Sequence, residues 1–323
     1  MKAPHLTRRR GFTLMELMVA MAITSIIVTV LVSITSIALD TWNRSRSELR
    51  ASRMGKMMVD YMARDLESLV TRRGNSNEWL SAIVDPELSK IGSSSLKSTN
   101  ASRLIFFTAP TDRYDGNAGI PTSDNGGDVC CVAYTLDWKR PVQVGASVFK
   151  TIVLNRKLVD PDLTFKGNAK FKPLLGVTSS TNSLDSVFIT AYDAQNISNS
   201  ANYTSENIYQ FSITFQVQVQ VTDSSGTAPS VRTVTVPVAM GSNGTTFFRV
   251  LGTEILTDYS GPYKNEVLSG RVTAAMISLT VLSDLAVDQI QEGKRKFTDD
   301  KAKAEFLAKN SYNFSKLVQL PGM

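Results

Sequence analysis

The chemistry of this chain is constrained first by Glu16, a carboxylate at the start of a long apolar run. Residues 17–39 contain no charged side chain, and Asp40 closes the run. At about 1.5 Å of rise per residue, a helix of this length crosses a hydrocarbon core about 30 Å thick. A carboxylate costs about 2.5–3.5 kcal/mol at the centre of a membrane helix and less near its end, and it is usually functional there. We therefore expect Glu16 to have a partner.

The apolar run is preceded by four basic residues: Lys2, Arg8, Arg9 and Arg10. By the positive-inside rule this flank is cytoplasmic, so the rest of the chain is expected outside. A cut between Gly11 and Phe12 would create an α-amino group four residues before Glu16. In an assembly of such helices, the amine of one subunit could pair with Glu16 of its neighbour. That pairing neutralises both groups and fixes the axial register between subunits.

Residues 11–16, Gly-Phe-Thr-Leu-Met-Glu, together with the basic leader and the apolar run, resemble the class III signal of type IV pilins and type II secretion pseudopilins. The resemblance is strong over about the first forty residues. It implies cleavage after Gly11 by a prepilin peptidase, N-methylation of Phe12, and Glu16 as the assembly carboxylate. The implied partners are other pilin or pseudopilin subunits and inner-membrane lipid.

Weaker resemblances point to a type within this family. The large size, the Arg64-Asp65-Leu66 segment and residues 271–284 are similar to the large minor types, namely the J-type of type II secretion and the W-type of type IV pili. A similar late run occurs in exported prepilin-like cassette proteins of Verrucomicrobia. The implied location is the bacterial inner membrane, crossed once, with the head in the periplasm or outside the cell as part of a filament.

Four segments follow from these patterns: a leader (1–11), a transmembrane and assembly helix (12–40), an amphipathic continuation of that helix (41–74) and a globular periplasmic head (75–323). Apolar residues recur at helical spacing beyond Asp40, and the basic pair Arg72-Arg73 before Gly74 predicts the helix end. Gly55 lies inside this helix, so we expect a bend or a close packing contact there. The apolar positions are Trp42, Leu49, Met54, Met57, Met58, Tyr61, Met62, Leu66 and Leu69.

The head reads as an antiparallel sheet. Runs rich in β-branched and aromatic residues predict strands at 104–108, 129–136, 148–154, 186–192 and 272–282. Strict alternation over 209–221, a turn, and a second alternating run over 231–238 predict a hairpin, with Pro237 at a sheet edge. We expect an irregular connection over 74–101 and one or two surface helices over 283–318. The predicted fold class is α+β, a long N-terminal helix laid across an antiparallel sheet.

Composition argues against several function classes. The 323 residues carry a net charge of +6, but four of the basic residues lie in the leader. The rest of the chain has 31 basic and 29 acidic residues, a net charge of +2, which removes the support for nucleic-acid binding. The only histidine, His5, also lies in the leader. Histidine-based metal sites and nucleophiles are therefore not expected in the rest of the chain. The sequence contains no phosphate-binding glycine loop or nucleophile elbow, and the carboxylates Asp137, Asp185 and Asp193 cannot be paired from sequence.

A glycine-rich loop and two adjacent cysteines leave alternatives open. The oxygens of Asp112, Asp115, Asp124 and Asp128 are hard donors at short spacing, as calcium requires, although these residues are also common in ordinary turns and the spacing is not that of an EF-hand. Cys130 and Cys131 either form a strained vicinal disulfide or, as neighbours on a strand, leave one thiol buried and one exposed. No other cofactor is expected.

The leading interpretation is a structural, non-enzymatic subunit: a minor pseudopilin or pilin. The alternative is an exported binding or hydrolytic protein that is held by a signal anchor and does not assemble into a filament. Ala20-Met21-Ala22 offers a small-x-small pattern for signal peptidase, but it lies inside the apolar run, where such a cut is not expected.

Overall fold

The computed structural model describes residues 13–71, 74, 76–110, 128–139, 150–166, 174, 183–192, 202–221, 230–241, 244–291, 295–297 and 299–321. Residues 1–12 lie outside this set, and with them Gly11 and Phe12. The chain divides into two compact units, of which the first ends at Leu49 and the second, the head, begins at Arg50.

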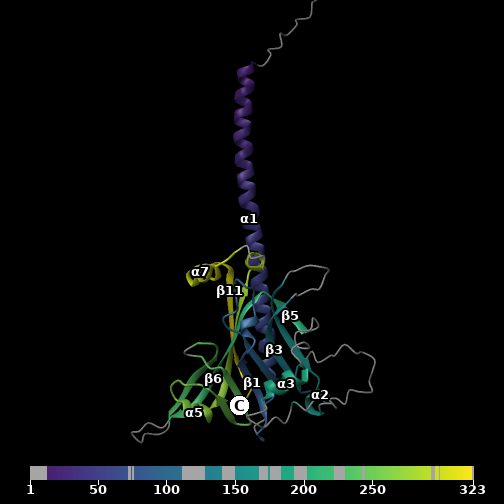
Figure 1. Ribbon diagram of the computed structural model, residues 1–323, viewed down its shortest axis with the longest axis vertical. Helices are drawn as coiled ribbons and strands as arrows, with labels where there is room; N and C mark the ends of the chain where they lie inside the picture. The colour runs from purple at the N-terminus through teal and green to yellow at the C-terminus, as the bar shows by residue number, and fades with distance from the viewer. Residues whose placement is uncertain are drawn as a thin grey trace, which may run out of the picture. The chain divides into compact units, whose positions relative to one another are not determined.

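Helix α1 (Leu14–Glu67) is one continuous element of 54 residues that contributes to both units (Figure 1). Within the head it buries the predicted methionine and leucine stripe, because Met58, Met62 and Leu66 are at most 1% exposed. Met57 was predicted to share that face but is 59% exposed. The helix ends at Glu67, so the predicted end at residues 72–74 is wrong.

The reason for the early end is that the chain joins a sheet directly after the helix. Leu69 forms a β-bridge with Thr108, and the backbone N–H of Val70 donates to the carbonyl of Phe107 at 2.9 Å. Strand hydrogen bonds therefore replace the next helical turn.

The first sheet has seven antiparallel strands in the order β5-β4-β3-β2-β1-β8-β9. Strands β2, β3 and β4 confirm three predicted strands. Strand β1 falls within 74–101, where an irregular connection was predicted, so that prediction is wrong. Their bounds are β1 (Glu78–Val84), β2 (Ser102–Thr108), β3 (Cys130–Lys139), β4 (Thr151–Val159), β5 (Tyr203–Glu206), β8 (Phe247–Leu251) and β9 (Glu254–Thr257).

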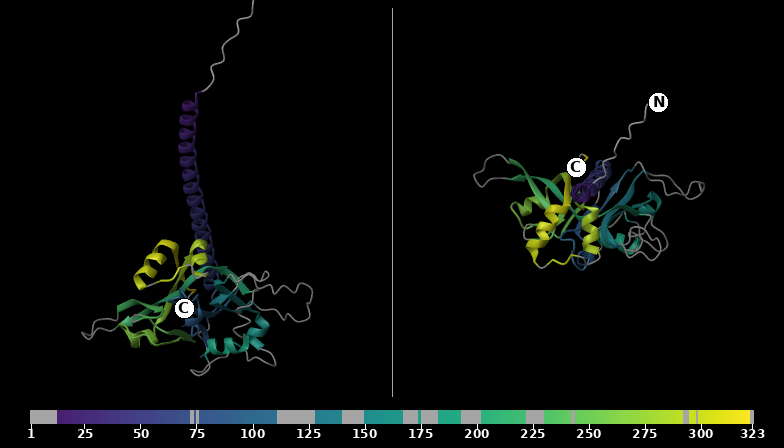
Figure 2. Two further views of the ribbon diagram at one scale, coloured as in Figure 1. Left: turned by 45° about the horizontal axis from the view of Figure 1, so that its top comes forward. Right: turned by 90° about the horizontal axis from the view of Figure 1, so that it is seen from above.

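The second sheet has four antiparallel strands in the order β11-β10-β6-β7. The predicted hairpin is confirmed as β6 (Ile208–Val221) paired with β7 (Ser230–Val238), and Pro237 lies on the edge strand β7. Strand β10 (Arg271–Leu282) was also predicted. Strand β11 (Ser311–Gln319) was not, because the tail was expected to be helical only. The antiparallel α+β class is confirmed, with two sheets in place of one; Figure 2, seen from above, shows them on opposite sides of the head.

Short helices complete the head, and one of them corrects a prediction. Residues 186–192 were predicted as a strand but belong to helix α3. The Ser183 hydroxyl accepts a bond from the Ser186 backbone N–H at 3.0 Å, and this N-terminal cap together with Asp185 outweighs the β-branched side chains. The helices are η1 (Leu88–Lys90), α2 (Pro161–Lys166), α3 (Leu184–Tyr192), α5 (Lys264–Leu268), α6 (Asp284–Gln291) and α7 (Asp300–Asn310).

The core lies between the sheets and around α1. Phe215 of β6 stacks on Phe248 of β8 with ring centroids 4.3 Å apart, which joins the two sheets. Gly55 of α1 faces the ring of Phe314 on β11, and a Cβ added at Gly55 would overlap three ring atoms. The expectation for Gly55 is thus met by a close packing contact.

One face of the four-stranded sheet is turned to solvent, and we call it the neutral face. Cross-strand register places on it side chains that are almost all uncharged. Among the described residues of this face, one side chain is charged: Arg271, at the first position of β10, which lies opposite Gln218. The uncharged members are Gln210, Ser212, Thr214, Gln216, Gln218 and Gln220 on β6, Val231, Thr233, Thr235 and Pro237 on β7, Ala274, Met276, Ser278 and Thr280 on β10, and Asn313, Ser315, Leu317 and Gln319 on β11.

Candidate assembly segment and polar clusters of the head

Helix α1 begins with a reciprocal cap between Thr13 and Glu16. The Glu16 backbone N–H donates to the Thr13 hydroxyl oxygen at 3.2 Å. In return, Glu16 Oε2 accepts from the Thr13 backbone N–H at 2.9 Å and from the Thr13 hydroxyl at 3.0 Å. This is the capping box of the pattern Thr-x-x-Glu, which satisfies two backbone donors that an open helix end leaves unpaired.

The cap supplies Glu16 with a partner inside its own chain, which sequence reasoning missed. The signal was present, because Thr13 and Glu16 have the spacing of a capping box. Both bonds from Thr13 reach Oε2. Gly11 and Phe12, the predicted processing residues, lie outside the described residues.

The apolar part of α1 exposes its side chains on every side. Met18, Ile27 and Ile37 are 63%, 53% and 66% exposed, and the helix is long and apolar enough to cross a membrane. This is consistent with the single-pass anchor of a pilin-type protein. Five hydroxyl groups of residues 24–41 bond inside the helix to the carbonyl four residues earlier, so these five need no outside partner in an apolar solvent. The donors are Thr24, Thr29, Ser33, Thr35 and Thr41, at 2.8–2.9 Å.

A buried cluster around Asp65 attaches α1 to the seven-stranded sheet. Asp65 Oδ2 accepts from the Tyr134 hydroxyl at 2.5 Å and from Arg156 Nε at 2.8 Å, and Oδ1 accepts from Arg156 Nη2 at 3.0 Å. The Arg156 guanidinium also lies 4.8 Å from the centroid of the Tyr61 ring. Burial, followed by the negative charge of Asp65, raises the pKa of Tyr134 well above its usual value. The phenol therefore stays protonated and acts as a donor.

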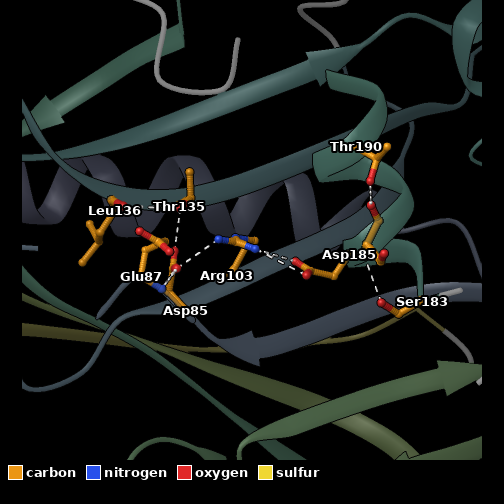
Figure 3. Close-up of polar contacts among 9 residues, drawn as sticks. Asp85, Glu87, Arg103, Thr135, Leu136, Ser183, Asp185 and Thr190 are labelled. Atoms are coloured by element: carbon orange, nitrogen blue, oxygen red, sulfur yellow. Dashed lines mark hydrogen bonds and ion pairs between the residues drawn. The ribbon is translucent and has the colours of Figure 1, made fainter. Parts of the chain in front are cut away.

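A second cluster lies on the other face of the same sheet and centres on Arg103 (Figure 3). Arg103 Nη2 donates to Asp85 Oδ1 at 2.9 Å, and Nη1 donates to the carboxylate of Asp185 on α3 at 3.1 and 3.3 Å. Asp85 also accepts from the Thr135 hydroxyl at 3.1 Å and from the Glu87 backbone N–H at 2.8 Å. Burial raises the pKa of Asp185, against the opposing effect of Arg103.

A third pair joins β1 and β8 beneath the start of α3. Arg249 Nε donates to Glu78 Oε1 at 2.8 Å, and Glu78 Oε2 accepts from the Leu184 backbone N–H at 2.9 Å. In all three clusters the guanidinium of an arginine neutralises a buried carboxylate. The three clusters hold α1 and α3 against the seven-stranded sheet.

The remaining predicted site residues give no assembled site within the described residues. Asp112, Asp115 and Asp124 of the calcium prediction lie outside them, as does Asp193, while Asp128 is exposed next to β3. No group of three or more His, Cys, Asp or Glu side chains suited to a metal occurs in the part of the chain that the structure describes. An open cleft of about 230 Å³ lies between the β8–β9 turn and β10, and Arg271 is the only ionisable residue among the described ones that line it.

Cys130 and Cys131 are both buried, and no disulfide joins them. Neither of the two alternatives holds: the cysteines are not joined, and the interpretation of one buried and one exposed thiol is wrong because both faces of β3 are covered. Tyr134 of β3 bonds to Asp65 of α1 on one face and Thr135 lies beside Asp85 on the other. Burial, followed by the adjacent Cys130, raises the pKa of Cys131 well above its usual value.

The family comparison agrees with the start of α1. Residues 6–32 match the model of the prokaryotic N-terminal methylation motif, which covers the residues before the helix, the Thr13–Glu16 cap and part of the apolar run. The match supports the type IV pilin and pseudopilin family and indicates a pilin-like precursor. No curated protein and no solved structure matches the chain.

Proposed function

We propose that this chain is a minor pilin or pseudopilin, a non-catalytic subunit of a type II secretion or type IV pilus-like filament. A prepilin peptidase cleaves it after Gly11, and Phe12 is then N-methylated. The observation that carries the proposal is the methylation motif at residues 6–32, which ends in a helix able to cross a membrane. Within the family, the size of the chain favours the J-type or W-type. The head then lies in the periplasm or outside the cell.

The Thr13–Glu16 cap suggests how the Glu16 carboxylate is stabilised in the membrane before assembly and how it binds a neighbouring subunit afterwards. Two donors from Thr13 reach Oε2, which lowers the cost of keeping the carboxylate near the membrane before assembly. Among the described residues Oε1 has no donor, so it can accept a bond from the Phe12 amine of a neighbouring subunit. The buried pair then fixes the axial register of the two helices.

Processing is tested by mass spectrometry of the N-terminus. The mature chain should begin at methylated Phe12. Gly11→Leu should retain the leader because the peptidase must admit a small residue beside the cut, whereas the matched variant Gly11→Ala should be cleaved. Normal maturation of Gly11→Leu would sink the proposal.

Assembly is tested separately with Glu16→Ala, which keeps the leader, Gly11 and Phe12. Cleavage should proceed, but crosslinking to partner pilins in membranes should fall. Breaking one side of a buried charge pair costs about 3–5 kcal/mol, which corresponds to more than about a hundredfold in association at about 1.4 kcal/mol per decade. Undiminished crosslinks would mean that Glu16 only caps the helix.

The alternative function is a signal-anchored exported protein with a binding or hydrolytic head. The open cleft beside Arg271 is the feature that favours it. The same mass spectra separate the two, because an uncut chain beginning at Met1 would support the anchor.

A further inference from the structure

The neutral face is unusual for a solvent-facing sheet. Charged residues make up 20% of the chain, yet the described residues of this face include no Asp, Glu or Lys. Solvent reaches it, since Val231, Met276 and Leu317 are 58%, 37% and 46% exposed. A face that only contacts water would be expected to carry charges, because these keep proteins soluble and apart.

Both edge strands of this sheet do carry a charge, but it is turned away from the neutral face. Lys316 of β11 lies opposite the buried Ile277, and its Nζ donates to Asp60 of α1 at 2.9 Å. Arg232 of β7 lies opposite the buried Val219, with its guanidinium 5.7 Å from the centroid of the Tyr263 ring. Lysines on edge strands usually oppose association with other chains. Here that protection is absent from the exposed side.

The layout of the neutral face is that of a protein interface. Met276 and Leu317 lie directly opposite each other on β10 and β11, beside Thr214 of β6 and, across it, Pro237 of β7. Glutamine, threonine, serine and asparagine surround this apolar row. Protein interfaces have such an apolar centre and polar rim, are enriched in Met and are depleted in Lys, Glu and Asp.

We propose that the neutral face binds the same face of a second copy of this chain. Two copies of a face that carries a net charge repel each other, whereas a nearly neutral face does not oppose contact with its own copy. The hydroxyl and amide side chains both donate and accept hydrogen bonds, so this face is complementary to itself. No aromatic side chain lies among its described residues to stack on a sugar ring, which disfavours a polysaccharide.

The area is sufficient for such a contact. At about 3.3 Å per residue and about 4.8 Å between strands, ten residues across four strands cover about 600 Å² in projection. Two copies would bury about 1,200 Å² together, which is the lower end of the size of specific interfaces. This contact lies in the head and does not depend on cleavage or on Glu16, so it is independent of the proposed function.

The test uses the full chain in its native membranes with a short thiol-to-thiol crosslinker. Ser278→Cys lies in the middle of the neutral face, and Thr190→Cys, at an exposed position of α3, is its matched control. The native Cys130 and Cys131 are buried and should not react. We expect a dimer of twice the chain mass for Ser278→Cys only, and the same dimer in the uncut Gly11→Leu background.

Charge at the apolar row provides the second arm. Adding Thr214→Glu should reduce the Ser278→Cys dimer at least tenfold, whereas Thr214→Gln should leave it unchanged. Co-expressing Thr214→Glu with Thr214→Lys chains should restore it, which also shows that both variants fold. The proposal is overturned if Ser278→Cys gives no dimer, if it crosslinks to a different protein, or if Thr214→Glu leaves the dimer intact.

Discussion

Replacing Gly55 by alanine should destabilise the head, against the usual effect of that substitution in a helix. Alanine is favoured over glycine in a helix interior by about 1 kcal/mol. At Gly55, however, the added Cβ overlaps the ring of Phe314, including Cγ at the base of the ring. Overpacking by a single carbon typically costs about 1–3 kcal/mol. Because the overlap involves three ring atoms, we take the upper part of that range, about 2–3 kcal/mol, which leaves a net loss of about 1–2 kcal/mol after the gain in helix propensity.

The assay is thermal unfolding of a truncated chain that starts at Thr41 and retains the whole compact unit from Arg50. For a domain of this size, a loss of about 1–2 kcal/mol lowers the Tm by about 2–6 °C. The matched control is Ser52→Ala, an exposed position on the same helix, which should not lower the Tm.

The contact itself is isolated by a double-mutant cycle with Phe314→Ala. Without the ring, Gly55→Ala should stabilise the head by about 1 kcal/mol, so the two changes should couple by about 2–3 kcal/mol. If Gly55→Ala stabilises the head equally in both backgrounds, the helix does not pack on β11 as described. The reasoning would then be refuted.

Three further predictions concern the head. Asp65→Ala leaves Arg156 buried without its carboxylate and should cost about 3–5 kcal/mol in denaturant unfolding, far more than Asp60→Ala, whose pair with Lys316 is half-exposed. Burial raises the pKa of Asp185 in the folded state above its unfolded value near 3.8, so the folded head binds this proton more tightly and the contribution of Asp185 to stability falls as the pH rises above that value. Asp185→Asn should therefore reduce the loss of Tm that accompanies a rise in pH above 3.8. The truncated chain starting at Thr41 should be soluble and unfold cooperatively, and aggregation whenever residues before Asp40 are removed would count against the division into anchor and head.

The elements predicted best from the sequence are those whose alternation of apolar and polar residues matches one buried and one exposed side. Residues 209–221 alternate because one side of β6 is buried and the other is the neutral face. Strand β1 shows no such alternation, since it is central in its sheet, paired with β2 and β8, and buried at both Glu78 and Trp79. In the sequence, Glu78 looks like part of a polar connecting segment. Its partner Arg249 lies 171 positions away and becomes a neighbour only in the folded chain.

The predictions for the C-terminal tail and for α3 were wrong for a different reason, which is that the sequence pattern of each element is short. Strand β11 alternates, with Phe314 and Val318 turned inward, but it follows the helical residues 300–310 without a break. Helix α3 has nine residues, too few for helical periodicity to outweigh β-branched side chains. The Arg103 and Arg249 clusters link residues 18 to 171 positions apart, and one sequence offers no means of pairing them.

The polar groups of helix α1 are satisfied in two different ways. Before Leu49, Glu16 and five hydroxyl groups bond within the helix, and within the head Asp65 bonds to the sheet. The local cap also changes the expected energy of assembly. In the proposed filament, a neighbour's amine would meet a carboxylate that already accepts two hydrogen bonds, so it would add less than it would to a bare charge. The loss in Glu16→Ala should therefore lie near the lower value of about 3 kcal/mol. That loss is still about a hundredfold in association, which crosslinking can resolve.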